Sequence, residues 1–289
     1  MIMTAFHAVK NELPRFFWVL VALLCMLPLS CTKTADDDED DEEEEEVVDP
    51  FEEYSDTIVI NLEGVSYTLR KVIGGTFSMG TDTIRDPQSQ LNERIVHEVT
   101  LSSYYIGETE VSQEFWNKVL PINPSEFKGD KLPVESASYR MVVDTFIRAL
   151  NNLTGRTFRL PTEAEWEFAA RGGIHTRDYK YSGSNNVAEV AWHSSNSDYQ
   201  THPIKTKACN ELYLYDMSGN VGEWCSDWYD IYNTFHQTNP HGPSFGSHRV
   251  VRGGSWVETE RYVRNTCRAR YLPGSQNHFV GFRLVLDAE

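Results

Sequence analysis

Carboxylates and turn residues lie together in the segment 213–229, YLYDMSGNVGEWCSDWY. Residues 216–220 have the composition of a chain reversal, because Asp and Asn bond their own backbone and Gly adopts positive φ without steric cost. The reversal would bring together four oxygen donors, namely the side chains of Asp216 and Glu223 and the carbonyls of Gly219 and Val221. Hard ligands of this kind suit calcium, which takes roughly six to eight oxygens. A turn of this composition also forms without metal, so the segment by itself is compatible with a calcium loop or a plain turn.

Alternating β-branched residues predict the strands that must position this segment. We expect a hairpin formed by 57–60 and 65–72, a glycine-flanked strand at 74–80, a strand at 97–107, a strand at 249–252 that enters the turn Gly253-Gly254, and a closing strand at 280–285. The glycine-rich run at 74–80 lacks a following Gly-Lys-Ser/Thr, so it is not a phosphate loop.

Three helices are expected. The first runs from Ser112 to about Leu120, the second from Ser138 to about Leu153, and the third begins at Thr162 with Glu165 completing a capping box. The glutamates at 163, 165 and 167 are interpreted as carboxylates favoured by the helix dipole, not as acid–base catalysts. Short strands, two to three helices and long ordered loops predict a single α+β domain.

The charge of the chain is concentrated in one segment. Eleven consecutive carboxylates occupy 36–46, so they account for most of the formal net charge of −17 and leave −6 for the rest of the 289 residues. Like charges in such a run repel one another, which predicts a disordered tether. No basic stripe or cluster is present, so we expect no nucleic-acid partner.

The N-terminus has the features of a bacterial export signal. Lys10 and Arg15 precede an apolar run at 16–29 that is too short to span a membrane, where about 20 residues are needed. The run ends in Leu-Pro-Leu-Ser-Cys31, which resembles a lipoprotein lipobox, and this resemblance implies lipidation of Cys31 and a membrane anchor. An ordinary secretory signal with an incidental cysteine is the alternative.

These features divide the chain into three parts. We expect a signal peptide at 1–30, a lipidated Cys31 with an acidic tether at 31–56, and a folded domain at 57–289. The acidic run after the lipidated cysteine resembles the export signal of many Bacteroidetes surface lipoproteins. That resemblance implies the outer membrane, and surface exposure is a further hypothesis. The alternative for the tether is a simple spacer.

Six motifs resemble the formylglycine-generating enzyme (sulfatase-modifying factor) family. They are GGTFSMG, the Glu110-Val111-Ser112 helix entry, RLPTEAEWEFAARGG, YDMSGNVGEWCSDWY, RVVRGGSW and VGFRLV. They occur in order over most of the folded part. The resemblance implies a fold related to the C-type lectins, with calcium bound by Asp216, Gly219, Val221 and Glu223.

Copper chemistry is not expected. Members that make formylglycine hold copper(I) between two cysteines shortly after the RGGS turn, and soft thiolates are what Cu(I) requires. The equivalent window here, 257–264, contains no cysteine, and Cys267 matches a later position outside that pair. We therefore predict that the protein does not generate formylglycine. Its three remaining cysteines, Cys209, Cys225 and Cys267, permit at most one disulfide.

Two functional classes remain open. The first is a surface lipoprotein that binds an unknown protein, peptide or glycan through the loop 172–210 and through a polar ligand face at 257–277, which resembles the variable face of retroelement-diversified proteins of this fold. The residues predicted for that face are Glu258, Arg261, Tyr262, Arg264, Asn265, Arg268, Arg270 and Tyr271. The second is an oxidative enzyme that uses Cys267, Tyr262 or histidines with an unconventional metal site.

Calcium binding predicts a chelator-sensitive melting temperature. A metal bound only by the native state stabilises it by mass action, so EDTA should lower the Tm of the unmodified protein. Asp216→Ala should lower the Tm and remove most of the response to EDTA. Differential scanning calorimetry with and without EDTA measures both effects. If EDTA leaves the Tm of the unmodified protein unchanged, the prediction of a calcium-binding loop is wrong.

Overall fold

The computed structural model describes residues 56–288, and the signal peptide, Cys31 and the acidic run lie outside this range. The first sheet contains four strands in the order β1-β2-β5-β13. Their bounds are β1 Thr57–Leu62, β2 Val65–Val72, β5 Tyr104–Gly107 and β13 Val285–Asp287. All neighbours in this sheet are antiparallel, and the predicted hairpin is confirmed by the pairing of Leu62 with Val65.

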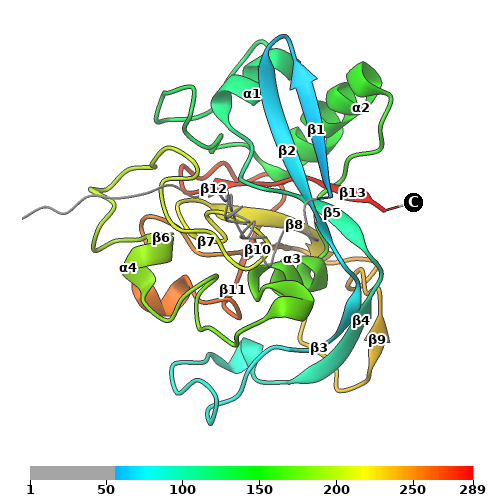
Figure 1. Cartoon of the computed structure of the whole chain (residues 1–289), viewed down its shortest axis with the longest axis vertical. Helices are drawn as coiled ribbons and strands as arrows, with labels where there is room; N and C mark the ends of the chain where they lie inside the picture. The colour runs from blue at the N-terminus through cyan, green and yellow to red at the C-terminus, as the bar shows by residue number, and fades with distance from the viewer. Residues whose placement is uncertain (1–55, 289) are drawn as a thin grey trace, which may run out of the picture. The chain divides into compact units, whose positions relative to one another are not determined.

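The second sheet forms the centre of the fold, with the order β11-β10-β8-β12 (Figure 1). Its strands are β8 Gly222–Trp228, β10 Arg249–Arg252, β11 Arg268–Tyr271 and β12 Val280–Gly281. The pairs β10–β8 and β10–β11 are antiparallel, whereas the short β12 runs parallel to β8. Glu223 therefore lies in a central strand, opposite Arg252.

Two smaller sheets complete the strands. The third sheet has the order β3-β4-β9, and β6 pairs with β7 in a parallel two-stranded sheet. Their bounds are β3 Gly75–Met79, β4 His97–Leu101, β9 Gln237–Thr238, β6 Ala191–Trp192 and β7 Ser218–Gly219. Gly219 has a φ of 82°, and a Cβ there would lie 2.2 Å from the carbonyl oxygen of Trp192. Only glycine fits this crossing.

The predicted helices are present, although one has an unexpected form. The helices are α1 Gln113–Val119, α2 Arg148–Thr154, α3 Glu163–Ala170 and α4 Val187–Val190, with short 3₁₀ turns η2 Leu91–Glu93, η4 Gly173–His175 and η5 Glu260–Tyr262. The Oγ of Ser112 accepts a hydrogen bond from Phe115 N, and Thr162 forms the expected capping box with Glu165. The first half of the second predicted helix is a π-helix, η3 Met141–Ile147.

Two predicted strands are each divided in the structure. The run 97–107 splits into β4 and β5, which belong to different sheets. The break follows from a close backbone crossing, because a Cβ at Gly74 would lie 2.4 Å from the carbonyl oxygen of Leu101, and Ser103 Oγ accepts from Gly74 N. The closing strand is similarly divided into β12 and β13.

Aromatic packing ties the helices to the first sheet and to the segment between β12 and β13. The rings of Tyr67 on β2 and Phe115 on α1 stack with centroids 5.1 Å apart. The rings of Trp116 and Phe146 stack with centroids 4.6 Å apart, and Phe282 contacts the Phe146 ring edge-on at 5.3 Å. All three side chains are fully buried. In Figure 1, α1 and α2 flank the β1–β2 hairpin, while α3 lies against β8 and β10. The mixed sheets, few helices and long loops confirm the predicted α+β class.

Within residues 56–288, none of the helices combines the length and the apolar character that a bilayer crossing requires.

Removal of the Phe282 ring should be strongly destabilising. Phe282→Ala leaves a cavity between α1 and η3, and such a truncation costs about 3–5 kcal/mol of unfolding free energy. Leu153→Ala is the control, because Leu153 is largely exposed on α2 and should change stability by less than about 0.5 kcal/mol. Urea unfolding followed by circular dichroism measures both. Similar midpoints for the two variants would contradict this account of the core.

Candidate functional site

Glu223 is held by a buried guanidinium. Its two carboxylate oxygens accept from Nη2 and Nε of Arg283, each at 2.6 Å, and Oε2 also accepts from the indole nitrogen of Trp166 at 2.7 Å. Both charged side chains are fully buried. Arg283 also donates to the carbonyl oxygens of Gly107 and Tyr215. The predicted calcium ligand Glu223 is thus one half of an ion pair that joins three segments.

Asp216 lies next to this pair in a left-handed conformation, with a φ of 56°. Its Oδ2 accepts from Lys205 N at 2.9 Å. Burial, reinforced by the charge of Glu223, raises the pKa of Asp216 to about 6. A third carboxyl group, Glu110, was not predicted as a site residue, although it belongs to the helix-entry motif.

Glu110 reaches the same loop from the N-terminal half of the chain. Its oxygens accept from Val221 N at 3.0 Å and from the amide nitrogen of Asn220 at 2.9 Å. Burial and the charges of Asp216 and Glu223 raise the pKa of Glu110 well above its usual range. The three buried carboxyl groups of Glu110, Asp216 and Glu223 therefore lie near a single guanidinium, that of Arg283. An excess of carboxyl groups over basic groups suits a bound cation.

The side-chain oxygens that are predicted to bind calcium already accept hydrogen bonds from other residues of the protein. Glu223 retains acceptor capacity beyond its bonds to Arg283 and Trp166, since a carboxylate offers about four lone-pair sites. Across residues 56–288, no three His, Cys, Asp or Glu side chains converge in a way that would hold a metal ion. A calcium ion would therefore depend on the carbonyls of Gly219 and Val221 as well as on Asp216 and Glu223, as the sequence predicts.

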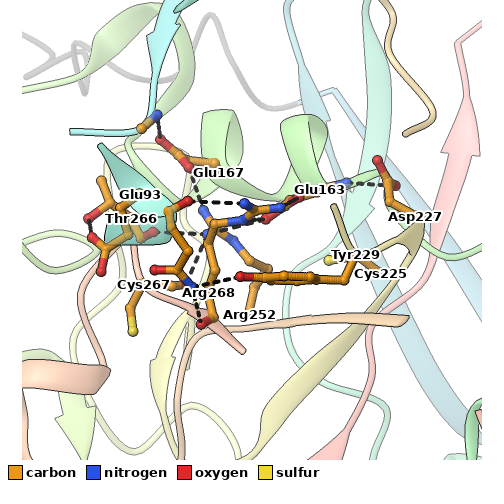
Figure 2. Close-up of polar contacts among 12 residues, drawn as sticks. Glu93, Glu163, Glu167, Cys225, Asp227, Tyr229, Arg252, Thr266, Cys267 and Arg268 are labelled. Atoms are coloured by element: carbon orange, nitrogen blue, oxygen red, sulfur yellow. Dashed lines mark hydrogen bonds and ion pairs between the residues drawn. The ribbon is translucent and has the colours of Figure 1, made fainter. Parts of the chain in front are cut away.

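A second cluster of buried ion pairs lies between α3 and the strands of the central sheet (Figure 2). Arg252 pairs with Glu167, and its guanidinium also donates to the carbonyls of Asn265, Thr266 and Cys267 at 2.9 to 3.0 Å. The Arg252 and Glu167 side chains are fully buried. This arginine therefore fixes the backbone that leads into β11.

Two further arginines bind carboxylates in the same cluster. Arg268 forms a bidentate pair with Glu163 at 2.5 and 2.8 Å, and Arg264 forms one with Glu93 at 2.7 Å for both bonds. The interpretation of Glu163 and Glu167 as carboxylates favoured only by the helix dipole is therefore incomplete. They are the buried counterions of arginines that lie 85 to 105 residues later in the chain.

The structure corrects the predicted ligand face. Arg264, Asn265 and Arg268 are at most 5% exposed, because their polar groups bind carboxylates and carbonyls inside the protein. Five of the eight predicted residues remain at least partly accessible, namely Glu258, Arg261, Tyr262, Arg270 and Tyr271. On β11, Arg268 and Arg270 lie on the same face of the strand, and both lie over the Tyr229 ring, but Arg268 is buried and Arg270 is exposed.

The loop 172–210 is anchored at its end by a buried amide. Asn210 Nδ2 donates to the carbonyl of Ala169 at 2.8 Å and to Ser182 Oγ at 3.0 Å, while its Oδ1 accepts from Leu212 N. Further along the loop, the rings of Trp192 and His202 stack at 3.7 Å. The loop predicted to bind a ligand is therefore ordered by the protein's own contacts.

The cysteines do not form a pair. Cys209, Cys225 and Cys267 are all free thiols. Cys267 is buried, accepts from Gln90 Nε2 at 3.3 Å, and has its pKa raised to about 11 by desolvation. Burial also raises the pKa of Cys225 well above its usual range. Both thiols are therefore protonated at neutral pH.

The separation of these two thiols follows from the sheet order. Cys225 lies on β8, and Cys267 immediately precedes β11, with β10 between them. Two strand spacings separate their backbones by at least roughly 9–10 Å, and the register adds an offset along the strands. A thiolate sits about 2.3 Å from a bound metal. Figure 2 shows the two cysteines on opposite sides of the ion-pair cluster.

Comparison with known proteins identifies the family. The model of the "Sulfatase-modifying factor enzyme 1-like domain" matches residues 68–288. The chain belongs to this family. The expectation drawn from the six sequence motifs is confirmed.

Relatives in the sulfatase-modifying factor family have different names. The chain is 32% identical to the Chaperone protein LppX of Paenibacillus barcinonensis over 76% of the chain and 90% of that protein. It is also 32% identical to the Serine/threonine-protein kinase pkn1 of Chlamydia caviae, but spans only 36% of that longer protein. The Formylglycine-generating enzyme of Streptomyces coelicolor is 36% identical over 45% of the chain and 47% of its own length.

Solved structures of the family agree with the fold. Treponema denticola variable protein 1 superposes with a TM-score of 0.74 at 31% identity, covering 80% of this chain and 99% of that one. PvdO from Pseudomonas aeruginosa has a TM-score of 0.66 at 21% identity and covers 80% of this chain, which shows the shared fold alone.

Neutralising one member of the buried cluster should be costly. Glu167→Gln removes the closer of the two carboxylates of Arg252 and leaves only Glu163, at 3.6 Å, and breaking a buried pair of this kind costs up to about 3–5 kcal/mol. Asp287→Asn makes the same chemical change at an exposed pair with Arg159 and should cost less than about 1 kcal/mol. Thermal unfolding of both variants provides the comparison. Equal losses would show that burial of the Arg252 pair contributes nothing.

Proposed function

We propose that this protein is a lipid-anchored lipoprotein of the bacterial envelope whose sulfatase-modifying factor domain binds a ligand or partner and does not generate formylglycine. The observation that carries the proposal is the state of its thiols. The window 257–264 has no cysteine, and the nearest one, Cys267, is buried and protonated. A copper(I) site needs a second thiolate next to the first, and Cys225 lies two strands away.

The accessible part of the ligand face supports a binding role. Arg261 and Tyr262 are exposed on η5, and Arg270 is exposed on β11. A small cavity of about 170 Å³ lies next to them, and its lining includes Glu258 and Tyr262. Arginine and tyrosine are enriched at recognition surfaces, where they combine polar groups with a large contact area.

The rigidity of the backbone beneath the face supports the same role. Arg252 holds three consecutive carbonyls below it, and Arg264 and Arg268 are fixed by buried carboxylates. A surface that is ordered before binding loses less conformational entropy on association. The relatives named as a chaperone and a kinase also favour a domain that contacts other proteins.

Calcium is proposed as the structural cation of the loop at 216–223. The excess of buried carboxyl groups around Arg283 supports this assignment. Asp216 and Glu223 would supply side-chain oxygens, and Gly219 and Val221 would supply carbonyls. When bound, the ion would neutralise charge and hold the turn in place.

The alternative function is an oxidative enzyme with an unconventional metal site. Its candidate thiol, Cys267, lies in a protonated and buried environment, whereas the thiolate is the metal-binding form. Elemental analysis of the purified protein separates the alternatives. Calcium alone favours the binding protein, and stoichiometric copper or iron favours the enzyme.

The proposal predicts no aldehyde formation. The purified protein, supplied with copper and oxygen, should leave a cysteine-containing sulfatase peptide unchanged, because it has no thiol pair with which to hold copper. The Formylglycine-generating enzyme of Streptomyces coelicolor is the positive control. Mass spectrometry of the peptide and hydrazide capture of the aldehyde measure the outcome. Conversion of the peptide at a rate near that of the control would overturn the proposal.

A further inference from the structure

A cavity of about 620 Å³ lies apart from the accessible ligand face, between α3, the end of β8 and the loop 229–243. Its lining includes Met79, His97, Trp228, Tyr232 and His241, and the rings of His97 and Tyr232 lie 4.9 Å apart. Four acidic or basic residues also line it, namely Glu163, Asp227, Asp230 and Arg268. The cavity is therefore polar at its base and aromatic along its wall.

Asp227 is the unusual group in this cavity. Its side chain is only 5% exposed, and its Oδ2 accepts from Glu163 N at 3.0 Å and from Ser226 Oγ at 3.1 Å. Within residues 56–288, its Oδ1 receives no hydrogen bond and no basic side chain lies within ion-pair distance of the carboxylate. A buried carboxylate without a cationic partner is energetically costly.

The neighbouring cations are already engaged elsewhere. The guanidinium of Arg268 donates hydrogen bonds to both carboxylate oxygens of Glu163 and lies 3.7 Å from the centroid of the Tyr232 ring. Arg249 lies over the Trp228 ring at 3.6 Å, and its Nη1 donates to the carbonyl of Ser226. Asp227 and Asp230 therefore leave the cavity with a net negative charge.

We propose that this cavity receives the lysine or arginine side chain of a partner polypeptide, with Asp227 as its counterion. The incoming ammonium or guanidinium group would pair with the free Oδ1. Trp228 and Tyr232 already carry Arg249 and Arg268 over their rings, and the aromatic surface that they contribute to the cavity can contact the methylene groups of a lysine or arginine side chain. The pair would satisfy the one buried acid of the cavity that lacks a basic partner.

An exposed apolar side chain at the rim favours a polypeptide over a free amine. Ile231 lines the cavity and is 77% exposed, so it lies at the rim. Exposed apolar surface rimmed by polar residues commonly marks a protein interaction site. A small amine would fill the charged base and leave this rim in water, whereas a peptide with apolar neighbours would cover both.

Protonation of Asp227 should control the affinity. Desolvation, followed by the charge of Glu163, raises the pKa of Asp227 to about 7. The titratable and charged groups that act on it are Glu163 and Glu165 of α3, Cys225 of its own strand, Arg249 of β10, and Tyr139. The titratable and charged residues that share its cavity are His97 of β4, Arg268 of β11, Asp230, Tyr232 and His241. Below about pH 6 the carboxyl group is mostly neutral, so cation binding should weaken as the pH falls.

Calorimetric titration of the full protein with acetyl-Phe-Lys-Phe-amide tests the proposal. At about pH 8 the peptide should bind at least about tenfold more tightly than its norleucine counterpart, which lacks the charge. Asp227→Asn should reduce the affinity for the lysine peptide by a similar factor. Asp144→Asn removes an exposed charge on η3, outside the cavity, and should leave the affinity unchanged.

Two further measurements separate folding from binding. Asp227→Asn removes a carboxyl group whose pKa is raised by folding, so its Tm at about pH 8 should equal or exceed that of the unmodified protein. Ile231→Ser changes only an exposed side chain at the rim and should weaken the binding of the peptide without affecting the binding of methylammonium. Failure of the lysine peptide to outbind norleucine overturns the proposal, and so does methylammonium binding as tight as peptide binding. Either result leaves the ligand-face proposal standing, because that face contributes no exposed residue to this cavity.

Discussion

Charge neutralisation inside the domain is the constraint on which this fold depends. Four buried arginines, Arg252, Arg264, Arg268 and Arg283, each contact a buried carboxylate. An ion removed from water costs several kcal/mol unless a counterion and further hydrogen bonds compensate. Each of these guanidinium groups has a carboxylate and further hydrogen bonds, and Nε of Arg252 is the nitrogen among them that has no partner in residues 56–288. The pairs connect segments distant in sequence, so they fix the path of loops that no regular element holds.

This arrangement explains how a domain of short strands maintains long ordered loops. Arg252 binds carbonyls before β11, and Arg283 binds carbonyls after β5 and before Asp216. Each guanidinium thereby replaces the backbone hydrogen bonds that a longer sheet would provide. The three thiols stay unpaired, so this part of the chain is held together without disulfides. The same cluster that stabilises the fold thus also determines which side chains reach the surface at 257–271.

Local features of the fold were predictable from the sequence, and long-range features were not. The β1–β2 hairpin and the capping box at Thr162 follow from patterns only a few residues long. The break between β4 and β5 depends on the approach of Gly74, and the burial of Arg264 and Arg268 depends on Glu93 and Glu163, far earlier in the chain. An arginine-rich polar segment looks the same in sequence whether its charges face water or a carboxylate.

The difference in burial between two arginines of β11 has an evolutionary consequence. Arg268 is buried and pairs with its counterion, while Arg270, two residues later on the same face, is exposed and makes no ion pair within residues 56–288. Mutational drift at the exposed positions would leave the buried ion pairs untouched, whereas drift at the buried ones would disrupt them. Selection can therefore act on the two sets separately, and a lineage can acquire new specificities at little risk to folding. Such a division makes the scaffold a natural starting point for engineered libraries.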